Sequence, residues 1–408
     1  MKSNPYNPGS GRPPPELAGR ASVIDLVRSE LERAVEGRSS RDIMLLGLRG
    51  VGKTVLLVEF EKMAEEITSH VSNVIEAGYN TPLPQLLVPQ LFRILIRLNR
   101  IKRAKHQAER AWNMFKSFAS AFKITIGGTG IEVKNTHATG DLTLDLTDLF
   151  VDIGEAAKAG NTAVIILVDE VQCLNGNDLG ALIMALHKIS QRQLPILFIG
   201  AGLPQLPKLA GEIKSYAERL FHYELIGKLD RTAAIDALVE PASAGNVRYT
   251  SGALNLIIKQ TQGYPYYLQE WGKHAWDIAL SSPITAKHVT EASKLAIATL
   301  DNGFFASRLR RLTDRQQDYA RAMAELTLPA RSSEVAKVLG SKVERTAPVR
   351  EEIIKKGMAY SPKRGLIDFT IPLFDEFLRR SLPKPQTTAQ KRSRKRGSAR
   401  QKHQRKSS

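Results

Sequence analysis

The sequence predicts an α/β fold, in which a doubly wound parallel sheet is followed by a helical unit and a small winged-helix unit. Gly47-Leu-Arg-Gly-Val-Gly-Lys-Thr54 has the spacing of a phosphate-binding loop and lies between a strand-like run and a helical pattern. The apolar runs 163–168 and 194–199 have the composition of strands buried on both faces. Helical patterns alternate with these strands, as they do in doubly wound sheets.

The residue types in the loop suit phosphate binding. Glycines let the backbone turn tightly and place its N–H groups against phosphate oxygens, and a helix that starts at the loop directs its positive end at them. Lys53 can reach the β- and γ-phosphates of ATP, and the Thr54 hydroxyl can ligate Mg²⁺. The alternative is a glycine turn that binds nothing. The predicted nucleotide-binding residues are Gly47, Leu48, Arg49, Gly50, Val51, Gly52, Lys53, Thr54, Val55 and Asp169.

The buried run 163–168 ends in two acids, Asp169 and Glu170. In an ATPase with a phosphate-binding loop, an acid at this strand end holds Mg²⁺, and the following Glu polarises the attacking water. We therefore predict Thr54 and Asp169 as the Mg²⁺ ligands, and Glu170 and Lys53 as catalytic residues. A strand that happens to end in two acids is the alternative, which the preceding loop disfavours.

Composition limits the location and the partners. The 408 residues suffice for two or three domains, and 59 Lys and Arg against 41 Asp and Glu give a net charge of +18. The tail from Ser381 supplies +10 of this charge without a carboxylate. Such a charge favours an acidic partner, nucleic acid first and a membrane surface second. Cys173 is the only cysteine, which fits a reducing cytoplasm, and the apolar run 163–168 is too short to cross a bilayer. We expect a cytoplasmic protein with no membrane partner.

Shifts in composition predict five segments along the chain. The leader is rich in proline, and the tail combines many cations with no acid, so both are expected to be disordered. The expected segments are a leader at 1–14, the sheet domain at 15–225, a helical lid at 226–300, a winged helix at 301–380 and a basic tail at 381–408.

Two stretches of the predicted sheet domain leave alternatives open. Residues 86–105 read as one long amphipathic helix with a leucine stripe and an arginine-rich face. That face could contact DNA or lipid, but a solvated face over a packed stripe is favoured. Residues 123–133 read as a β-hairpin around a glycine turn. The hairpin could project as an arm or pack on its own domain.

The C-terminal part predicts three helices followed by a hairpin, which is the order of a winged helix. The helices are expected at 314–326, 332–339 and 342–356, and the hairpin at 358–370. In a helix-turn-helix DNA reader the third helix lies in the major groove. DNA contact is favoured here, but winged helices also dock proteins. The cations of the third helix are Lys342, Arg345, Arg350, Lys355 and Lys356.

Together these motifs resemble the AAA+ ATPases of the origin-recognition and initiator type. Pro-Pro-Glu-Leu-Ala-Gly-Arg at 14–20 is similar to the short box that lines the adenine pocket in that family, and both ATPase motifs, the lid and the winged helix follow in the family's order. The resemblance spans residues 13 to 380. It implies ATP and Mg²⁺ as cofactors and an ATP-dependent homo-oligomer. It also places Arg219 at the arginine finger, a catalytic residue that reaches the ATP of a neighbouring subunit. An ordinary surface arginine is the alternative.

The sequence departs from this family at two places. Gly200, Ala201 and Gly202 follow the run 194–199, where the family usually presents a polar sensor residue. No second sensor arginine is found near Gly263-Tyr-Pro265, a lid sequence that resembles the related STAND signalling ATPases. Both departures favour slow hydrolysis.

The leading hypothesis for function is an ATP-dependent DNA-binding switch that binds duplex DNA through the winged helix and the basic tail. The alternative is a STAND-like signalling or defence ATPase whose C-terminal module binds protein. A GTPase is disfavoured because the sequence has no Asn-Lys-x-Asp stretch.

Overall fold

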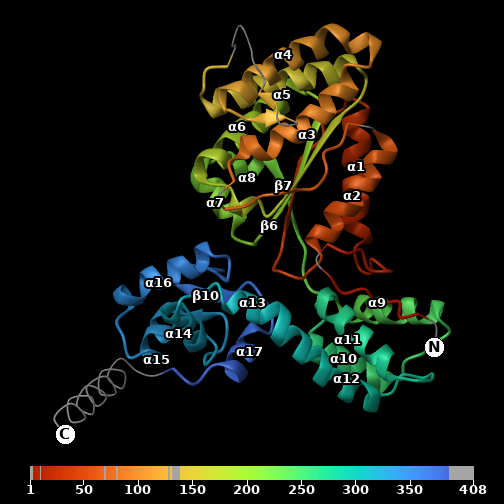
Figure 1. The fold of residues 1–408 in the computed structure, drawn as a ribbon, viewed down its shortest axis with the longest axis vertical. Coiled ribbons are helices and arrows are strands. Elements are labelled where there is room, and N and C mark those ends of the chain that lie inside the picture. Colours follow the sequence, from red (N-terminus) through yellow and green to blue (C-terminus); the bar gives the residue numbers. More distant parts are fainter. Residues whose placement is uncertain are drawn as a thin grey trace. The chain divides into compact units, whose positions relative to one another are not determined.

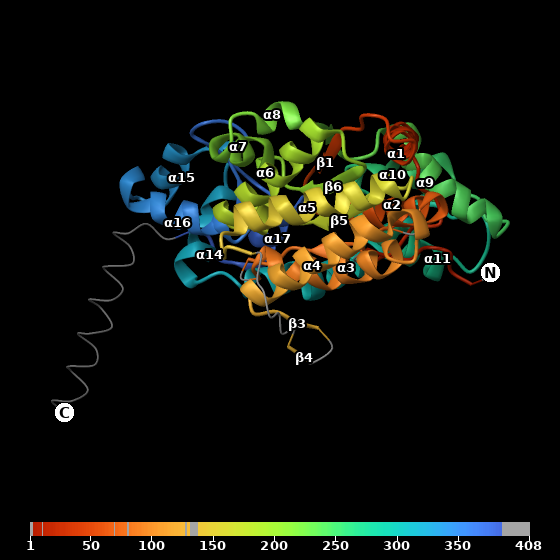
Figure 2. The same cartoon turned by 90° about the horizontal axis from the view of Figure 1, so that it is seen from above.

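The computed structural model describes residues 3–9, 11–68, 70–79, 81–126, 129–130 and 138–385. The chain divides into two compact units, residues 1–286 and residues 287–408, and each is described by itself. Figures 1 and 2 show the elements of both units from two directions.

The first unit is built on a five-stranded parallel sheet with the strand order β2-β5-β6-β1-β7. Each residue of β1, β5 and β6 is buried, which explains why these strands are apolar almost throughout. The predicted doubly wound sheet is confirmed. The strands are β1 (Asp42–Leu46), β2 (Ile75–Glu76), β5 (Val164–Asp169), β6 (Ile196–Gly202) and β7 (Phe221–Leu225).

Helices cover both faces of this sheet, because successive strand residues point to opposite sides. On one face, Ile43 and Leu45 pack in a core with residues of α1 (Ala21–Val35) and α2 (Lys53–Ile67). On the other face, Met44 and Leu46 pack in a core with residues of four longer helices. Figure 1 shows α1 and α2 on the opposite side of the sheet from α5 and α6. These four helices are α3 (Leu83–Leu98), α4 (Lys105–Ala121), α5 (Leu142–Ala159) and α6 (Gly176–Arg192).

The single helix predicted at 86–105 is wrong, since the chain forms two helices there. Helix α3 ends at Leu98, a short 3-10 turn spans Lys102–Ala104, and α4 then runs back against α3. The leucine stripe of α3 is buried and its arginines are exposed, which fits the solvated-face interpretation. Two short strands, β3 (Thr125–Ile126) and β4 (Thr129–Gly130), form the predicted hairpin. Figure 2 shows this hairpin at the periphery of the first unit. Positions 127–128 and 131–133 of the prediction lie outside the described residues.

Two short helices and three lid helices complete the first unit. Helices α7 (Leu206–Ile213) and α8 (Ala217–Leu220) precede β7. The lid helices are α9 (Arg231–Ala244), α10 (Ser251–Thr261) and α11 (Pro265–Ile278). The start of α11 contacts the phosphate-binding loop, since the backbone N–H of Tyr266 donates to the Gly50 carbonyl at 3.3 Å.

The described part of the leader, residues 3–9 and 11–14, differs from the expected disorder. Tyr6 is only 4% exposed, and its ring meets Trp276 of α11 edge to face with centroids 6.2 Å apart. Its hydroxyl donates to the Leu238 carbonyl of α9 and accepts from the Tyr249 hydroxyl. A Cβ at Gly272 would lie 2.7 Å from this ring, so the glycine provides the space. The leader therefore packs on the lid.

We expect the Tyr6→Ala variant to lose about 3 kcal/mol of unfolding free energy, because truncating a buried aromatic ring leaves a cavity. Tyr6→Phe keeps the ring and loses only the hydroxyl, so about 1 kcal/mol is expected. Thermal and urea unfolding of the full chain measure both effects. Unfolding of Tyr6→Ala that matches the wild type would show that the leader does not pack on the lid in solution.

The second unit contains helices and a three-stranded antiparallel sheet with the order β8-β10-β9, the elements of a winged-helix domain. Phe305, Phe369, Phe374 and Phe377 pack together in its interior. Its elements are α12 (Ala286–Thr299), a π-helical turn (Leu300–Phe305), α13 (Ala306–Leu309), α14 (Asp314–Met323), β8 (Ala330–Arg331), α15 (Ser332–Val338), α16 (Val343–Lys355), β9 (Ala359–Tyr360), β10 (Leu366–Phe369) and α17 (Phe374–Ser381).

The predicted basic tail lies largely outside the described residues, since 386–408 are not among them. The five-segment division of the chain stays a prediction. Within the described residues, no helix is both long enough and apolar enough to span a membrane.

Candidate nucleotide-binding site

The phosphate-binding loop connects β1 to α2 at the carboxyl edge of the sheet. Gly50 and Gly52 have φ angles of 83° and 96°, a region that side chains other than glycine rarely adopt. A Cβ at Gly47 would lie 2.2 Å from the Ile226 carbonyl oxygen, so this position also requires glycine. Among the described residues, no side chain caps the N-terminus of α2. The first N–H groups of this helix are therefore left for an anion.

Lys53 begins α2 and is held inside the loop. Its side chain is 7% exposed, and its ammonium donates to the Gly47 carbonyl at 2.8 Å and to the Leu48 carbonyl at 3.0 Å. Burial lowers the pKa of Lys53 to about 8, against the opposing effect of the nearby Glu170 and Asp169 carboxylates. A phosphate in the loop would add negative charge beside this ammonium, so Lys53 is suited to bind it.

Thr54 and Asp169, the two predicted Mg²⁺ ligands, lie in contact. The Thr54 hydroxyl donates to Asp169 Oδ2 at 2.5 Å, and burial raises the pKa of Asp169. A hydroxyl and a carboxylate are oxygen ligands of the kind Mg²⁺ takes, usually with phosphates and water completing the shell. Among the described residues there is no group of three or more His, Cys, Asp or Glu side chains that could hold a metal alone. When bound, Mg²⁺ would neutralise charge on the β- and γ-phosphate oxygens.

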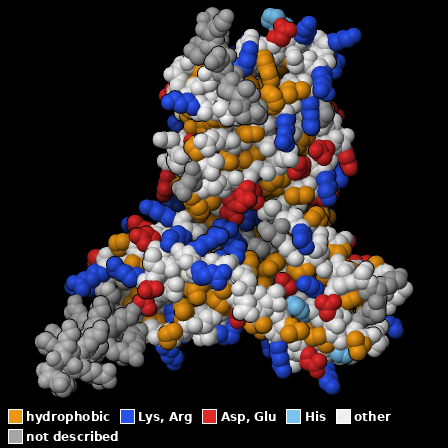
Figure 3. Space-filling model, in the orientation of Figure 1, with side chains coloured by type: hydrophobic (Ala, Val, Ile, Leu, Met, Phe, Trp, Pro, Cys, Tyr) orange, Lys and Arg blue, Asp and Glu red, His pale blue; other side chains and the backbone are white. Residues whose placement is uncertain are grey.

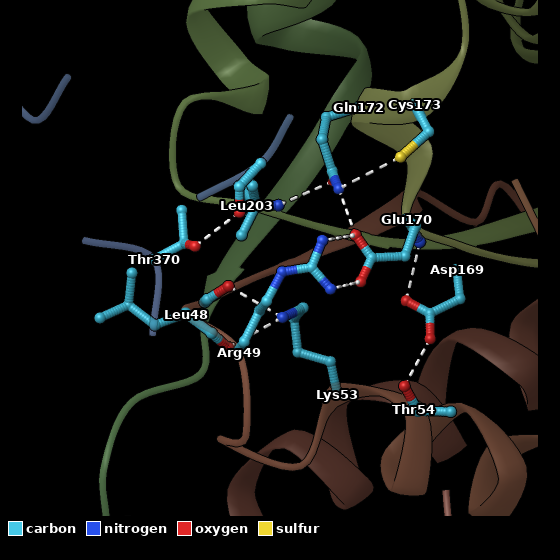
Figure 4. A network of polar contacts seen from close by, with 12 residues as sticks. Leu48, Arg49, Lys53, Thr54, Asp169, Glu170, Gln172, Cys173, Leu203 and Thr370 are labelled. Carbon is cyan, nitrogen blue, oxygen red and sulfur yellow. Dashed lines mark hydrogen bonds and ion pairs between the residues drawn. The ribbon is translucent and has the colours of Figure 1, made fainter. Parts of the chain in front are cut away.

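Glu170 lies beside this pair, but its carboxylate is turned to Arg49 of the loop (Figure 4). Arg49 Nη1 lies 3.0 Å from Glu170 Oε1 and Nη2 lies 3.4 Å from Oε2. The Gln172 side-chain amide also donates to Oε2. The structure thus brings together Lys53, Thr54, Asp169 and Glu170, as the sequence predicts, and adds two residues to which the sequence assigned no catalytic role.

Gln172 is one residue that the sequence reasoning missed. Its amide oxygen accepts the backbone N–H of Leu203 at 2.9 Å, just beyond the end of β6. A Cβ at Gly202 would lie 2.7 Å from that oxygen, so the glycine leaves the space for Gln172. A polar side chain is therefore present at the end of β6, but it comes from the residues after β5. Two features of the sequence could have indicated this contact. A Gln follows Glu170 by two residues, and a glycine stands at the end of the next strand.

Arg20 is the second missed residue. The sequence reasoning placed it in the box at 14–20 without a role of its own. Its guanidinium donates to the Val51 carbonyl at 3.0 Å and to the Gly227 carbonyl at 2.6 Å. It therefore connects the box to the phosphate-binding loop and to the segment after β7. Gly11, upstream of this box, lies against Thr54, since a Cβ there would be 3.3 Å from the threonine methyl.

Arg219 does not join this cluster. It belongs to α8, just before β7, and Phe221 at the start of β7 pairs in register with Asp42 at the start of β1. Arg219 lines a pocket of about 420 Å³ at this end of the sheet, together with Arg33, Arg41 and His187. Because the loop follows the other end of β1, Arg219 lies at the opposite edge of the sheet from the loop of its own chain.

We expect ATP affinity to fall as the pH rises above 8. Lys53 has a pKa of about 8 in the nucleotide-free protein, and bound phosphates would raise it, so binding above that pH requires proton uptake. Affinity should be flat below pH 7 and about tenfold weaker at pH 9. Calorimetry at pH 8.5 in two buffers of different ionisation heat should show this uptake. Equal heats in the two buffers would contradict the assignment.

A phosphate-binding loop after β1 and an acid pair at the end of β5, in a sheet of this strand order, define a P-loop ATP hydrolase. Residues 16–199 match the family described as "AAA ATPase domain". Residues 302–378 match the family described as "Domain of unknown function (DUF8462)". No curated protein matches the sequence significantly.

Solved structures align with this chain at low sequence identity. The Walker-type ATPase PABY2304 of Pyrococcus abyssi aligns with a TM-score of 0.52 at 18% identity, over 90% of this chain and 98% of that chain. Two further structures align with TM-scores of 0.44 at 15% identity, each over 90% of this chain. They are the RuvB Holliday junction branch migration motor of Thermotoga maritima, covered to 97%, and the Orc1 protein of Aeropyrum pernix in complex with DNA, covered to 94%.

Proposed function

We propose that the chain is an ATP-dependent DNA-binding switch with slow hydrolysis. The observation that carries this proposal is the convergence of Lys53, Thr54, Asp169 and Glu170 at one edge of the sheet, within a chain of net charge +18. The residues explain nucleotide binding, and the charge explains the choice of an acidic partner.

In this proposal each residue of the site acts on ATP or on the attacking water. The backbone of the loop from Gly47 to Val55 binds the phosphates, and Lys53 neutralises charge on the β- and γ-phosphates. Thr54 and Asp169 would hold Mg²⁺. Glu170 accepts a proton from the water that attacks the γ-phosphate. Arg219 acts on the ATP of a neighbouring copy of the chain, so hydrolysis requires a homo-oligomer.

Slow hydrolysis is supported by the surroundings of Glu170. Both carboxylate oxygens already have partners, Arg49 on each and Gln172 on Oε2. The three residues at the end of β6 that could orient the water, Gly200 to Gly202, carry no polar side chain. A state with bound ATP would then persist long enough to serve as a signal.

The proposed DNA contact is on α16 and the β9–β10 hairpin of the second unit. Lys342, Arg345 and Lys355 are exposed, as are Lys363 and Arg364 in the turn between the strands. Figure 3 shows Lys and Arg side chains in the region of α16, with acidic side chains among them. A helix with cations beside an exposed basic turn fits binding to the groove and backbone of a duplex.

Two of the five predicted DNA-contacting cations have intramolecular partners instead. Arg350 is half-buried and donates to the Ser361 hydroxyl at 3.0 Å and to the Leu366 carbonyl at 3.2 Å, so it fastens α16 to the hairpin. Lys356 donates to the Arg311 carbonyl and to Gln316 Oε1, each at 2.7 Å. We therefore assign base contact to Lys342, Arg345 and Lys355, and phosphate contact to the turn.

The test is fluorescence anisotropy on labelled duplexes with ATP, ADP or no nucleotide, at several salt concentrations. The full chain should bind more tightly with ATP than with ADP, and binding should weaken steeply with salt. Truncation after Arg380 should weaken binding to all duplexes alike and flatten the salt slope by about 0.9 for each phosphate the tail neutralises.

A matched pair of variants separates the two proposed surfaces. Lys342→Ala with Arg345→Ala should reduce any sequence preference, which truncation of the tail should leave intact. An unchanged salt slope after truncation would remove the tail from the interface. Absence of salt-dependent DNA binding in every nucleotide state would contradict the proposal and favour a signalling ATPase whose second unit binds protein.

A further inference from the structure

The ion pair between Arg49 and Glu170 joins the phosphate-binding loop to the proposed catalytic base. Their side chains are 23% and 20% exposed, so both are largely buried but still in contact with water. The guanidinium faces the carboxylate with two nitrogens, a fork geometry that fixes direction as well as charge (Figure 4). Arg49 lies in the loop that we propose to bind phosphates, where the same fork could face a phosphate instead.

Backbone geometry holds Glu170 in place for this pair. Glu170 has φ of 54°, an uncommon conformation for a residue with a side chain, and its N–H donates to Asp169 Oδ1 at 2.8 Å. The Glu170 carbonyl accepts the Cys173 N–H at 2.7 Å, which closes the turn after β5. Gln172 is fixed in the same turn by Leu203 and donates to the carboxylate from the other side. The carboxylate is therefore held between Arg49 and Gln172.

We infer that Arg49 is a positioning residue that restrains Glu170 until ATP binds, when the γ-phosphate takes over the guanidinium and releases the carboxylate. This inference rests on the proposed function of the site. A terminal phosphate carries more negative charge than a carboxylate and accepts the same bidentate contact, so it competes for Arg49. Glu170 is then free to accept a proton from water, while Gln172 keeps it oriented.

The inference predicts an energetic coupling between the two residues that appears in ATP binding without any hydrolysis. If ATP must displace Glu170 from Arg49, removing the carboxylate charge removes the competitor. Glu170→Gln should then raise ATP affinity by about fivefold when Arg49 is present, a coupling within the usual range for linked sites. In the Arg49→Ala background there is no pair to break, so Glu170→Gln should leave the affinity unchanged.

The experiment is a double-mutant cycle, measured by calorimetric titration of Mg²⁺–ATP and Mg²⁺–ADP into the wild type, Arg49→Ala, Glu170→Gln and the double variant. The coupling should be about fivefold for ATP and smaller for ADP, which has no γ-phosphate to take over the guanidinium. Arg49→Lys keeps the charge but not the two-nitrogen fork. The gain in ATP affinity on adding Glu170→Gln to Arg49→Lys should therefore lie between the gains in the wild-type and Arg49→Ala backgrounds. If Arg49→Ala does not fold, Arg49→Lys takes its place in the cycle.

A matched charge control comes from the neighbouring strand. Glu76 ends β2 in register with Asp169 and is exposed, so Glu76→Gln removes the same charge near the site without touching Arg49. Its effect should be small and equal in both Arg49 backgrounds. If Glu170→Gln also has equal effects in both backgrounds, it acts by general repulsion of the phosphates and the inference is overturned. Equal coupling for ATP and ADP would overturn the role of the γ-phosphate.

Failure of the inference differs from failure of the proposed function. Suppose that Lys53→Ala loses ATP binding while the effects of the Arg49 and Glu170 variants are additive. The nucleotide-binding site is then supported, and only the proposed role of Arg49 is overturned. If the wild type binds no ATP, or Lys53→Ala binds it normally, both are overturned.

Discussion

Replacing Lys53 with alanine should weaken ATP binding by about 100-fold. The Lys53 ammonium is nearly buried and within hydrogen-bonding distance of two carbonyls of the phosphate-binding loop, so it lies where the β- and γ-phosphates would bind. Hydrogen bonds between charged groups contribute about 1.5–3 kcal/mol each, and about 3 kcal/mol corresponds to this loss of affinity. Calorimetric titration of ATP with Mg²⁺ measures it directly.

The control for this variant is Lys62→Ala on the same helix. Lys62 is exposed and pairs with Glu59, one turn earlier on the helix, at 3.7 Å, so its removal should leave ATP affinity unchanged. Thermal unfolding of both variants checks that α2 is intact. If Lys53→Ala binds ATP as tightly as the wild type, the loop from Gly47 to Thr54 is not the nucleotide site.

The sheet and its phosphate-binding loop could be predicted because their signals are local. The apolar run 163–168 needs two covered faces, and the glycine spacing of the loop needs particular backbone angles, which Gly50 and Gly52 adopt. The acids at 169 and 170 follow a buried strand, so their position at the carboxyl edge follows from the strand itself. For these elements, residue order alone fixes which groups lie at the same edge.

The partners of Glu170 and Tyr6 could not be predicted, because they depend on contacts distant in sequence. Arg49 and Glu170 are 121 positions apart, and nothing in either local sequence specifies that the side chains face each other. Tyr6 lies in a proline-rich leader whose composition indicates disorder, yet its partner Trp276 comes from the last helix of the lid. Local composition reports what a segment does alone, whereas burial depends on the surface that other segments provide.

The helix at 86–105 shows a further limit of periodicity. The leucine stripe of α3 was correctly assigned to the core, but the break after Leu98 has no proline or glycine to mark it. The stop is set by tertiary packing, because α4 turns back and covers the same helix. In the same way, Arg350 counted as a surface cation in the sequence, although its neighbours in the hairpin offer it a hydroxyl and a carbonyl.

Replacing Arg219 with alanine should slow ATP hydrolysis by about 1,000-fold in assembled protein, the lower end of the range for an arginine finger. The defect should act across a subunit interface. Arg219 precedes the start of β7, whereas the loop follows the end of β1, and these strands pair in register over the five residues of β1. Five residues at about 3.3 Å each separate the two ends by about 16 Å, too far for Arg219 to reach the ATP of its own chain.

Mixing variants tests this geometry. Arg219→Ala keeps Glu170, and Glu170→Gln keeps Arg219, so each protein alone should be nearly inactive. In a 1:1 mixture of random closed assemblies, about a quarter of the interfaces combine an intact Glu170 with an intact Arg219, and a comparable fraction of wild-type hydrolysis should return. Mixing Arg219→Ala with the double variant supplies no intact Arg219 and should restore nothing. Normal hydrolysis by assembled Arg219→Ala would show that Arg219 is an ordinary surface arginine. No recovery in the mixture of the two single variants would show that both residues serve the same subunit's site, and recovery in the control mixture would show that Arg219 is not required.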